Sequence, residues 1–220
     1  MTQVPEAIEI ETGPQPAAAV IWLHGLGADG NDFVPVVPEL GLPGRLALRF
    51  VFPHAPVRPV TINMGMRMRA WYDIAQLGGG PEDEAGIRKS QGLLENLIAR
   101  EKSRGVPAER IVLAGFSQGG AIALQTALRY PLRLAGVLAL STYLPLAATL
   151  AAERGKANQD LPIFMAHGRF DDLIPADRAE QSKGLLVGLG YEVEWRTYPM
   201  PHSVCAEEIA DIAAWLVRIL

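Results

Sequence analysis

The sequence is poor in cysteine, in long hydrophobic runs and in clustered positive charge. Cys205 is the one cysteine among 220 residues, which excludes an internal disulfide and a structural zinc site built from several thiolates. The apolar run over residues 17–23 is too short to cross a bilayer, and no lysine or arginine precedes Arg45, whereas a secretory signal starts with positive charge. We therefore expect a cytoplasmic protein that is not an integral membrane protein.

The charge balance also limits the classes of partner. Acidic residues outnumber basic ones by 24 to 20, the formal net charge is −4, and the basic residues are scattered along the chain. This distribution gives no basic patch for a nucleic acid. Hydrophobic residues make up 49% of the chain, enough for one substantial core, so we expect residues 1–220 to form a single domain. The apolar helix faces are compatible with a homodimer.

Short apolar segments alternate with longer segments of helical periodicity. The short segments predict strands at residues 18–23, 46–52, 110–114, 134–140, 161–166 and 192–198. The longer segments predict helices at residues 82–104, 120–129, 175–189 and 206–219. This alternation is typical of an α/β fold whose mostly parallel central sheet carries helices on both faces and binds ligands beyond the carboxyl ends of its strands.

The motif Gly115-Phe-Ser-Gln-Gly119 lies where a predicted strand meets the helix that follows it. A Gly-x-Ser-x-Gly turn exposes its serine to a base, and the flanking glycines leave room for a strained backbone. Taken alone, the motif also fits a glycine-rich turn that has no catalytic role. The hypothesis that Ser117 is a nucleophile therefore depends on whether the chain supplies its partners.

Candidate partners for Ser117 follow in the order acid and then histidine, each just after a predicted strand, as this kind of turn requires. The acid is Asp171 or the adjacent Asp172, because only one of them can point at the imidazole while the other is solvated or caps a helix. The base is His202, in the loop after the last predicted strand. Residue types in this order and placement predict a Ser–Asp–His triad.

The other histidines and the cysteine suit other roles. His24 and His167 each precede a glycine at the end of a strand, where an imidazole more often braces loops than takes a proton. His54 has no reactive partner nearby in the sequence, so we expect it to be structural or exposed. A cysteine nucleophile at Cys205 is a poor alternative, because a small buried thiol explains that residue better.

Two backbone amides are predicted to bind the oxyanion of an acyl-transfer intermediate. They are the N–H of Gln118, directly after the serine, and the N–H of Leu26, in the loop after an early strand. The same loop, residues 25–30, fits a dinucleotide fingerprint, but no acidic residue lies between Glu39 and Asp73 to bind the ribose. We expect no nicotinamide, no other cofactor and no metal.

The segment over residues 55–80 is predicted to be long and irregular and to lie near the acyl site. Its apolar members are Met64, Met66, Met68, Trp71, Tyr72, Ile74 and Leu77. Such side chains suit an adaptable apolar groove, and they equally suit a loop packed on the core. The substrate-binding candidates are Trp71 and Ile74 from this segment and Leu173 from the loop after Asp171.

Taken together, the motifs resemble the small carboxylesterase and acyl-protein thioesterase (lysophospholipase) branch of the α/β-hydrolases over nearly the whole chain. The resemblance rests on Leu23-His-Gly-Leu-Gly-Ala-Asp-Gly30 with Asn31-Asp32, Pro53-His-Ala-Pro56, Trp71-Tyr-Asp73-Ile74, Gly115-Phe-Ser-Gln-Gly-Gly120, Ser141-Thr-Tyr-Leu-Pro145, His167-Gly168 with Asp171, and His202-Ser203. It implies a metal-free α/β-hydrolase without a large lid domain. It also implies Ser117, Asp171 and His202 as the triad, with the amides of Leu26 and Gln118 at the oxyanion.

The chain departs from the resembled branch at Arg169, where an acidic residue is common, and at Thr142, where a glycine is common. We expect both to alter the charge or width of the site mouth. The expected reaction is hydrolysis of carboxylic esters with short to medium acyl chains, and of thioesters, through an acyl-enzyme on Ser117. The physiological substrate stays open among a small ester, a lysophospholipid and an S-acylated protein, and a non-catalytic binding module is the remote alternative.

Overall fold

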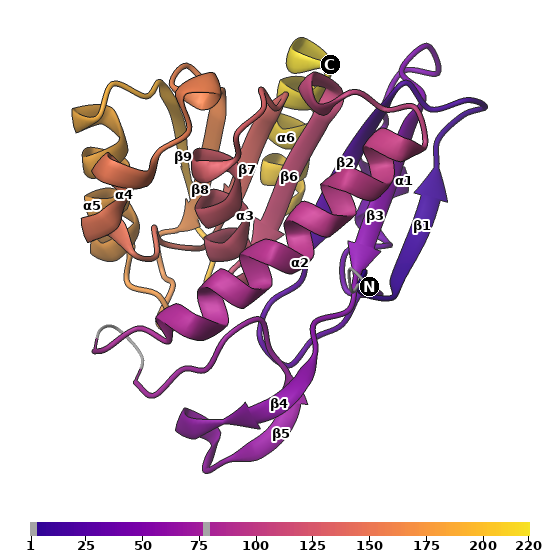
Figure 1. Ribbon diagram of the computed structural model, residues 1–220. Coiled ribbons are helices and arrows are strands. Elements are labelled where there is room, and N and C mark those ends of the chain that lie inside the picture. The colour runs from indigo at the N-terminus through magenta and orange to yellow at the C-terminus, as the bar shows by residue number, and fades with distance from the viewer. Residues whose placement is uncertain (1–3, 77–79) are drawn as a thin grey trace.

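Seven strands form a central sheet in the computed structural model of the protein, which describes residues 4–76 and 80–220 (Figure 1). Their order is β1-β3-β2-β6-β7-β8-β9, and every neighbouring pair is parallel except β1 with β3. The strands span Ala7–Glu11 (β1), Ala18–Leu23 (β2), Leu48–Pro53 (β3), Ile111–Phe116 (β6), Gly136–Leu140 (β7), Ile163–Gly168 (β8) and Val193–Tyr198 (β9). The predicted mostly parallel sheet is confirmed.

The sequence did not predict the edge strand β1. The six predicted strands are present, with ends that differ from the predicted ones by at most two residues. In β1, Ile8 and Ile10 pack against the core, while Glu9 and Glu11 bind arginines across the surface. An edge strand buries only one face, so its short alternation of apolar and acidic residues was a weaker signal than the continuous apolar runs of the central strands.

Helices cover both faces of the sheet, as predicted. Ile21 of β2 belongs to the core covered by α2 (Glu84–Ser103), α3 (Gln118–Arg129), α4 (Ala147–Glu153) and α5 (Ala176–Gly188). Trp22, the next residue, belongs to the core under α1 (Val36–Glu39) and α6 (Ala206–Ile219). In Figure 1, α2 crosses the front of the sheet and α6 lies behind it. Among the helices within residues 4–76 and 80–220, none has the length and apolar composition that a membrane span needs.

Residues 57–69 form a β-hairpin, so the prediction of an irregular segment is wrong there. β4 (Val57–Val60) pairs antiparallel with β5 (Met66–Arg69), and Figure 1 shows this hairpin projecting away from the central sheet. Met64 and Gly65 in the connection have positive φ angles of 55° and 75°. Most of the hairpin is exposed, so its two strands are not continuous apolar runs and the sequence pattern did not predict them. Leu77 lies outside the described residues.

Candidate active site

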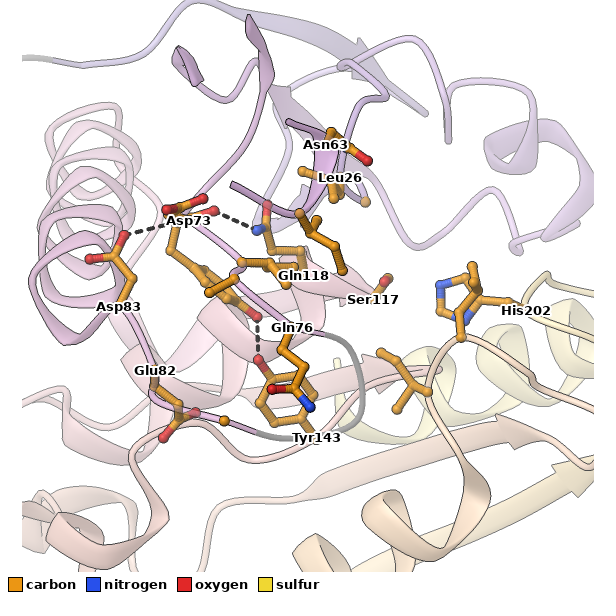
Figure 2. A pocket seen from close by; sticks show the side chains of 18 of the residues that line it. Leu26, Asn63, Asp73, Gln76, Glu82, Asp83, Ser117, Gln118, Tyr143 and His202 are labelled. Atoms are coloured by element: carbon orange, nitrogen blue, oxygen red, sulfur yellow. Dashed lines mark hydrogen bonds between the residues drawn. The ribbon is translucent and has the colours of Figure 1, made fainter. Parts of the chain in front are cut away.

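Ser117 lies at the sharp turn between β6 and α3. Its φ of 54° and ψ of −121° are unfavourable for a residue with a side chain, and hydrogen bonds on both sides hold it there. Its N–H donates to Leu140 O at 2.8 Å, and its carbonyl oxygen accepts from Ala121 N at 3.1 Å. This backbone presents the serine side chain to a cavity beyond the carboxyl ends of the strands (Figure 2).

Gly115 and Gly119 are required by the close packing of this turn. A Cβ at Gly115 would lie 2.3 Å from the carbonyl carbon of Gly119, and a Cβ at Gly119 would lie 2.4 Å from Leu23 O. Backbone atoms of a central strand and of the first turn of α3 cannot move away as the end of a flexible side chain can. The steric explanation of the motif, which the sequence suggested, agrees with this geometry.

Thr142 supports the same turn through the backbone of Ser117. Its Oγ1 donates to Ser117 O at 2.7 Å, and its side chain is buried. Thr142 does not line the cavity, and Arg169 is exposed outside the cavity lining. The expectation that these two residues alter the width of the site mouth is therefore not supported. Thr142 instead acts on the backbone that positions the serine.

Asp171 and His202 form a buried hydrogen-bonded pair beside the serine. His202 Nδ1 lies 2.7 Å from Asp171 Oδ2. The other carboxylate oxygen accepts from the backbone N–H groups of Leu173 at 3.0 Å and Ile174 at 2.8 Å. The Asp171 side chain is fully buried, whereas Asp172 is exposed, so the structure selects Asp171 as the partner of the imidazole. With Nδ1 bound to a carboxylate, Nε2 is the ring nitrogen available to take a proton.

The loop of His202 brings the imidazole to the cavity edge that Ser117 faces. Figure 2 shows the Ser117 side chain directed toward the His202 ring. The ring of Phe116 packs against that imidazole with a centroid separation of 4.7 Å. The loop can pass close to β8 because residue 168 is a glycine, at which a Cβ would lie 2.3 Å from Pro201 O.

His24 braces the loop after β2, as predicted. Its Nε2 accepts from Ala55 N at 3.0 Å, and its Nδ1 lies 2.7 Å from Gly25 O. Burial lowers the pKa of His24 to about 4, so the ring stays neutral, with its proton on the nitrogen that faces the carbonyl. His54 also has a structural role, because its Nδ1 accepts from Gly30 N at 3.0 Å.

The two predicted oxyanion amides meet at the cavity. Leu26 and Gln118 both line it, close to Ser117. Within residues 4–76 and 80–220, neither of their backbone N–H groups donates to a protein acceptor. Both N–H groups are therefore free of acceptors within this part of the chain, as the predicted oxyanion role requires.

A cavity of about 390 Å³ opens beside Ser117 and His202, a volume within the usual range for small-molecule sites. Ile74 and Leu173 line it, as predicted. Met64, Met66 and Met68 do not line it, and the first of these is 92% exposed. The methionines therefore belong to the projecting hairpin, and the apolar wall near the serine comes from other side chains.

Trp71 is buried behind the cavity, so the prediction that it contacts substrate is wrong. It is 1% exposed and absent from the cavity lining. Its indole N–H donates to His24 O at 2.9 Å. Its backbone N–H donates to the side-chain Oε1 of Gln118 at 2.7 Å, while Gln118 Nε2 donates to Tyr72 O at 2.8 Å. Trp71 thus joins the two loops that carry the oxyanion amides.

Several cavity residues were missed by the sequence reasoning. Figure 2 shows Tyr143, Gln76 and Glu82 at the end of the cavity away from His202. The hydroxyl of Tyr143 lies 2.9 Å from that of Tyr72, burial raises the pKa of both phenols, and the Arg178 guanidinium stacks 3.4 Å from the centre of the Tyr143 ring. Of Tyr143, Gln76 and Glu82, only Tyr143 lies in a motif that the sequence analysis singled out. Gln76 and Glu82 lie in loops with no recognisable sequence pattern.

Carboxylates hold the outer wall of the cavity to the start of α2. Asp83 Oδ1 accepts from Gly86 N and caps this helix, while its Oδ2 accepts from Asp73 N at 2.8 Å. The Asp73 carboxylate accepts from the Thr61 backbone at 2.7 Å and from its hydroxyl. Burial raises the pKa of Asp73, but these hydrogen bonds outweigh it and leave that pKa below its ordinary value. The wall is thus positioned by a few side-chain bonds.

Known proteins of similar sequence and structure cover nearly the whole chain. The sequence profile described as phospholipase/carboxylesterase matches residues 5–220. Acyl-protein thioesterase 1 of Gibberella zeae is 43% identical over 94% of this chain and 92% of its own, and that of Mycosarcoma maydis is 42% identical over 97% and 95%. Among crystal structures, Arabidopsis thaliana SOBER1 has a TM-score of 0.87 at 29% identity, covering 92% of this chain and 98% of its own. Acyl-protein thioesterase 2 of Zea mays has a TM-score of 0.86 at 28% identity, covering 98% and 99%.

Proposed function

Because this chain belongs to the phospholipase/carboxylesterase family and is a hydrolase of ester or thioester bonds, we propose that it works through an acyl-enzyme on Ser117. The observation that carries the proposal is the 2.7 Å contact between His202 Nδ1 and Asp171 Oδ2 at the edge of the cavity that Ser117 lines. A carboxylate in this position fixes the tautomer that presents Nε2 to the serine and stabilises the imidazolium that forms.

In the proposed cycle, His202 Nε2 takes the proton of the Ser117 hydroxyl while Oγ attacks the carbonyl carbon of the substrate. The resulting oxyanion accepts from the N–H groups of Leu26 and Gln118, whose positions at the cavity support this role. The imidazolium then gives its proton to the leaving oxygen or sulfur, which leaves the acyl group on the serine. Water, deprotonated by the same imidazole, releases the acid.

We propose acyl chains of short to medium length as the acyl group. The cavity volume of about 390 Å³, the apolar side chains of Ile74 and Leu173, and the polar end formed by Tyr72 and Tyr143 support this limit. The relatives named acyl-protein thioesterases support an S-acylated protein as the physiological substrate, with a lysophospholipid as the alternative. A cytoplasmic location is consistent with the single cysteine, and the homodimer stays a prediction.

The direct test compares wild type with Ser117→Ala on a series of p-nitrophenyl esters and matched acyl thioesters of increasing chain length. We expect Ser117→Ala to lose on the order of 10⁴-fold or more in kcat on every substrate. Ser103→Ala, at the end of α2, where the hydroxyl donates to Arg100 O within its own helix, serves as the matched control with wild-type rates. A fluorophosphonate should label the wild type and not Ser117→Ala. Unchanged hydrolysis by Ser117→Ala would refute the mechanism.

A further inference from the structure

A second histidine, His167, lies against the same carboxylate oxygen of Asp171 as His202 does. It is the next-to-last residue of β8, and its side chain is fully buried. Its Nε2 lies 2.8 Å from Ile174 O and 3.3 Å from Asp171 Oδ2. The ring stacks on Trp195 with a centroid separation of 6.3 Å and an interplanar angle of 24°. The imidazole is thus held in one orientation beside the carboxylate.

The hydrogen-bonding groups around His167 determine which ring nitrogen carries the proton. A carbonyl oxygen can only accept, so the short contact to Ile174 O requires the proton on Nε2. The Asp171 carboxylate, which also accepts, faces that same nitrogen. Nδ1 is buried without a hydrogen-bond partner among residues 4–76 and 80–220, as suits the ring nitrogen that carries no proton. His167 therefore donates its Nε2–H to Ile174 O, and Asp171 Oδ2 lies 3.3 Å from the same nitrogen.

We propose that His167 is a positioning residue of the triad, whose Nε2–H holds Asp171 Oδ2 toward His202. The proposal rests on the function proposed above. Asp171 Oδ1 is already fixed by the N–H groups of Leu173 and Ile174, so rotation of the carboxylate is limited by what binds Oδ2. Without His167, the side-chain partner left to Oδ2 among the described residues is His202 itself, the group that Asp171 has to orient.

The same N–H also closes the turn that carries the acid. Ile174 N donates to Asp171 Oδ1, and Ile174 O accepts from His167. Leu173 and Ile174 both line the cavity, so His167 connects the orientation of the acid to the cavity wall. The next residue, Gly168, lets the His202 loop pass. The pair His167-Gly168 therefore supports both members of the Asp171–His202 contact.

The test compares His167→Leu, which removes the donor, with His167→Gln. The Gln side chain places its Nε2 as many bonds from the backbone as the imidazole Nε2, so it can keep the donor. Asn158→Ala is the control for lost buried hydrogen bonds, because Asn158 is buried far from the cavity lining and bonds the backbone of Tyr130, Leu132 and Leu134. Each variant is measured for kcat and KM between pH 5 and 9 and for its unfolding midpoint.

For His167→Leu we expect kcat to fall on the order of 10- to 100-fold with KM nearly unchanged. The acid limb of the kcat/KM profile should move to lower pH, because a carboxylate that is no longer held toward His202 stabilises its imidazolium less. His167→Gln should recover most of kcat and the wild-type profile. Asn158→Ala should unfold more easily and keep the wild-type kcat and profile.

A wild-type kcat and profile in His167→Leu would overturn the proposal, and so would a Gln variant as impaired as the Leu variant. If His167→Leu does not fold, NMR provides the test. The chemical shift of the His167 Nε2–H proton is then compared between the wild type and Asp171→Asn. We expect that chemical shift to change in Asp171→Asn, and an unchanged chemical shift would overturn the proposal. These outcomes leave the comparison of wild type with Ser117→Ala unaffected, so a failure here is distinct from a failure of the proposed function.

Discussion

The nucleophile turn and the outer wall of the cavity face the same space but are built in opposite ways. The turn lies between buried backbone segments, and a methyl group added at Gly115 or Gly119 would meet backbone atoms within 2.4 Å. The wall over residues 61–76 and 80–83 is mostly exposed or half-buried. It is held by a few polar bonds, such as those from Thr61 to Asp73 and from Asp73 to Asp83.

This difference separates the chemistry from the choice of substrate. Close-packed backbone keeps Ser117 in one conformation and tolerates little change, because strain at such a site is supported by everything around it. Most side chains of the wall, by contrast, are partly exposed, although Trp71 and Tyr72 belong to the core. We therefore expect mutations at the turn to abolish activity on all substrates, and mutations at the wall to change the relative rates of substrates.

Apart from replacement of Ser117 itself, the largest effect on activity is expected from Gly119→Ala. The added methyl group would lie 2.4 Å from Leu23 O and 2.6 Å from His24 O, so the turn or the strand has to move. We expect a loss of about 3 kcal/mol in the free energy of unfolding and of about 100-fold or more in kcat/KM on every ester. Denaturant unfolding and ester kinetics measure the two effects.

Gly184→Ala is the matched control for that change. Gly184 lies in α5, exposed, with nothing within 4 Å of an added Cβ, so the substitution should raise the free energy of unfolding by about 1 kcal/mol and leave kcat unchanged. Wild-type kinetics in Gly119→Ala would show that the turn is not the rigid element inferred here.

The same contrast explains which features the sequence could predict. The strands, and the positions of Ser117 and Asp171 beyond the ends of β6 and β8, were predictable because these strands are largely apolar runs whose ends occupy fixed places in the fold. The hairpin and the role of Trp71 were not. Whether an aromatic side chain lies in a cavity or behind it depends on partners far along the chain, here His24 O and the Gln118 side chain, and no local pattern encodes that choice.

An effect confined to stability is expected from Glu208→Gln, at a buried position in the first turn of α6. Burial raises the pKa of Glu208 from 4.5 to about 8. The folded state therefore keeps a proton that the unfolded state releases between those values, and stability is lost as the pH rises from about 4.5 to about 8. The amide of the Glu208→Gln variant does not titrate, so this pH-dependent loss is absent from it. The difference in free energy of unfolding between Glu208→Gln and the wild type should therefore grow, in favour of the variant, by on the order of 1 kcal/mol per pH unit in this window.

Urea unfolding of both proteins at pH 5, 6.5 and 8 measures that difference. Glu207→Gln is the control, because Glu207 is the preceding residue in the first turn of α6 and is exposed. Its curve should stay parallel to that of the wild type across the three pH values. A Glu208→Gln curve parallel to the wild type would mean that Glu208 is not buried in its protonated form.

The smallest effect is expected at the wall, from Ile74→Ala. Ile74 is half-buried and lines the cavity beside the serine, so removing three carbons makes room for a longer acyl chain while the turn stays intact. Each methylene buried is worth about 0.8 kcal/mol, so the ratio of kcat/KM for octanoyl to butyryl p-nitrophenyl esters should rise about fourfold. Met64→Ala, on the exposed hairpin and outside the cavity lining, should leave this ratio unchanged. If both rates fell together in Ile74→Ala, the wall would be supporting the catalytic residues as well, and the separation between the two regions would not hold.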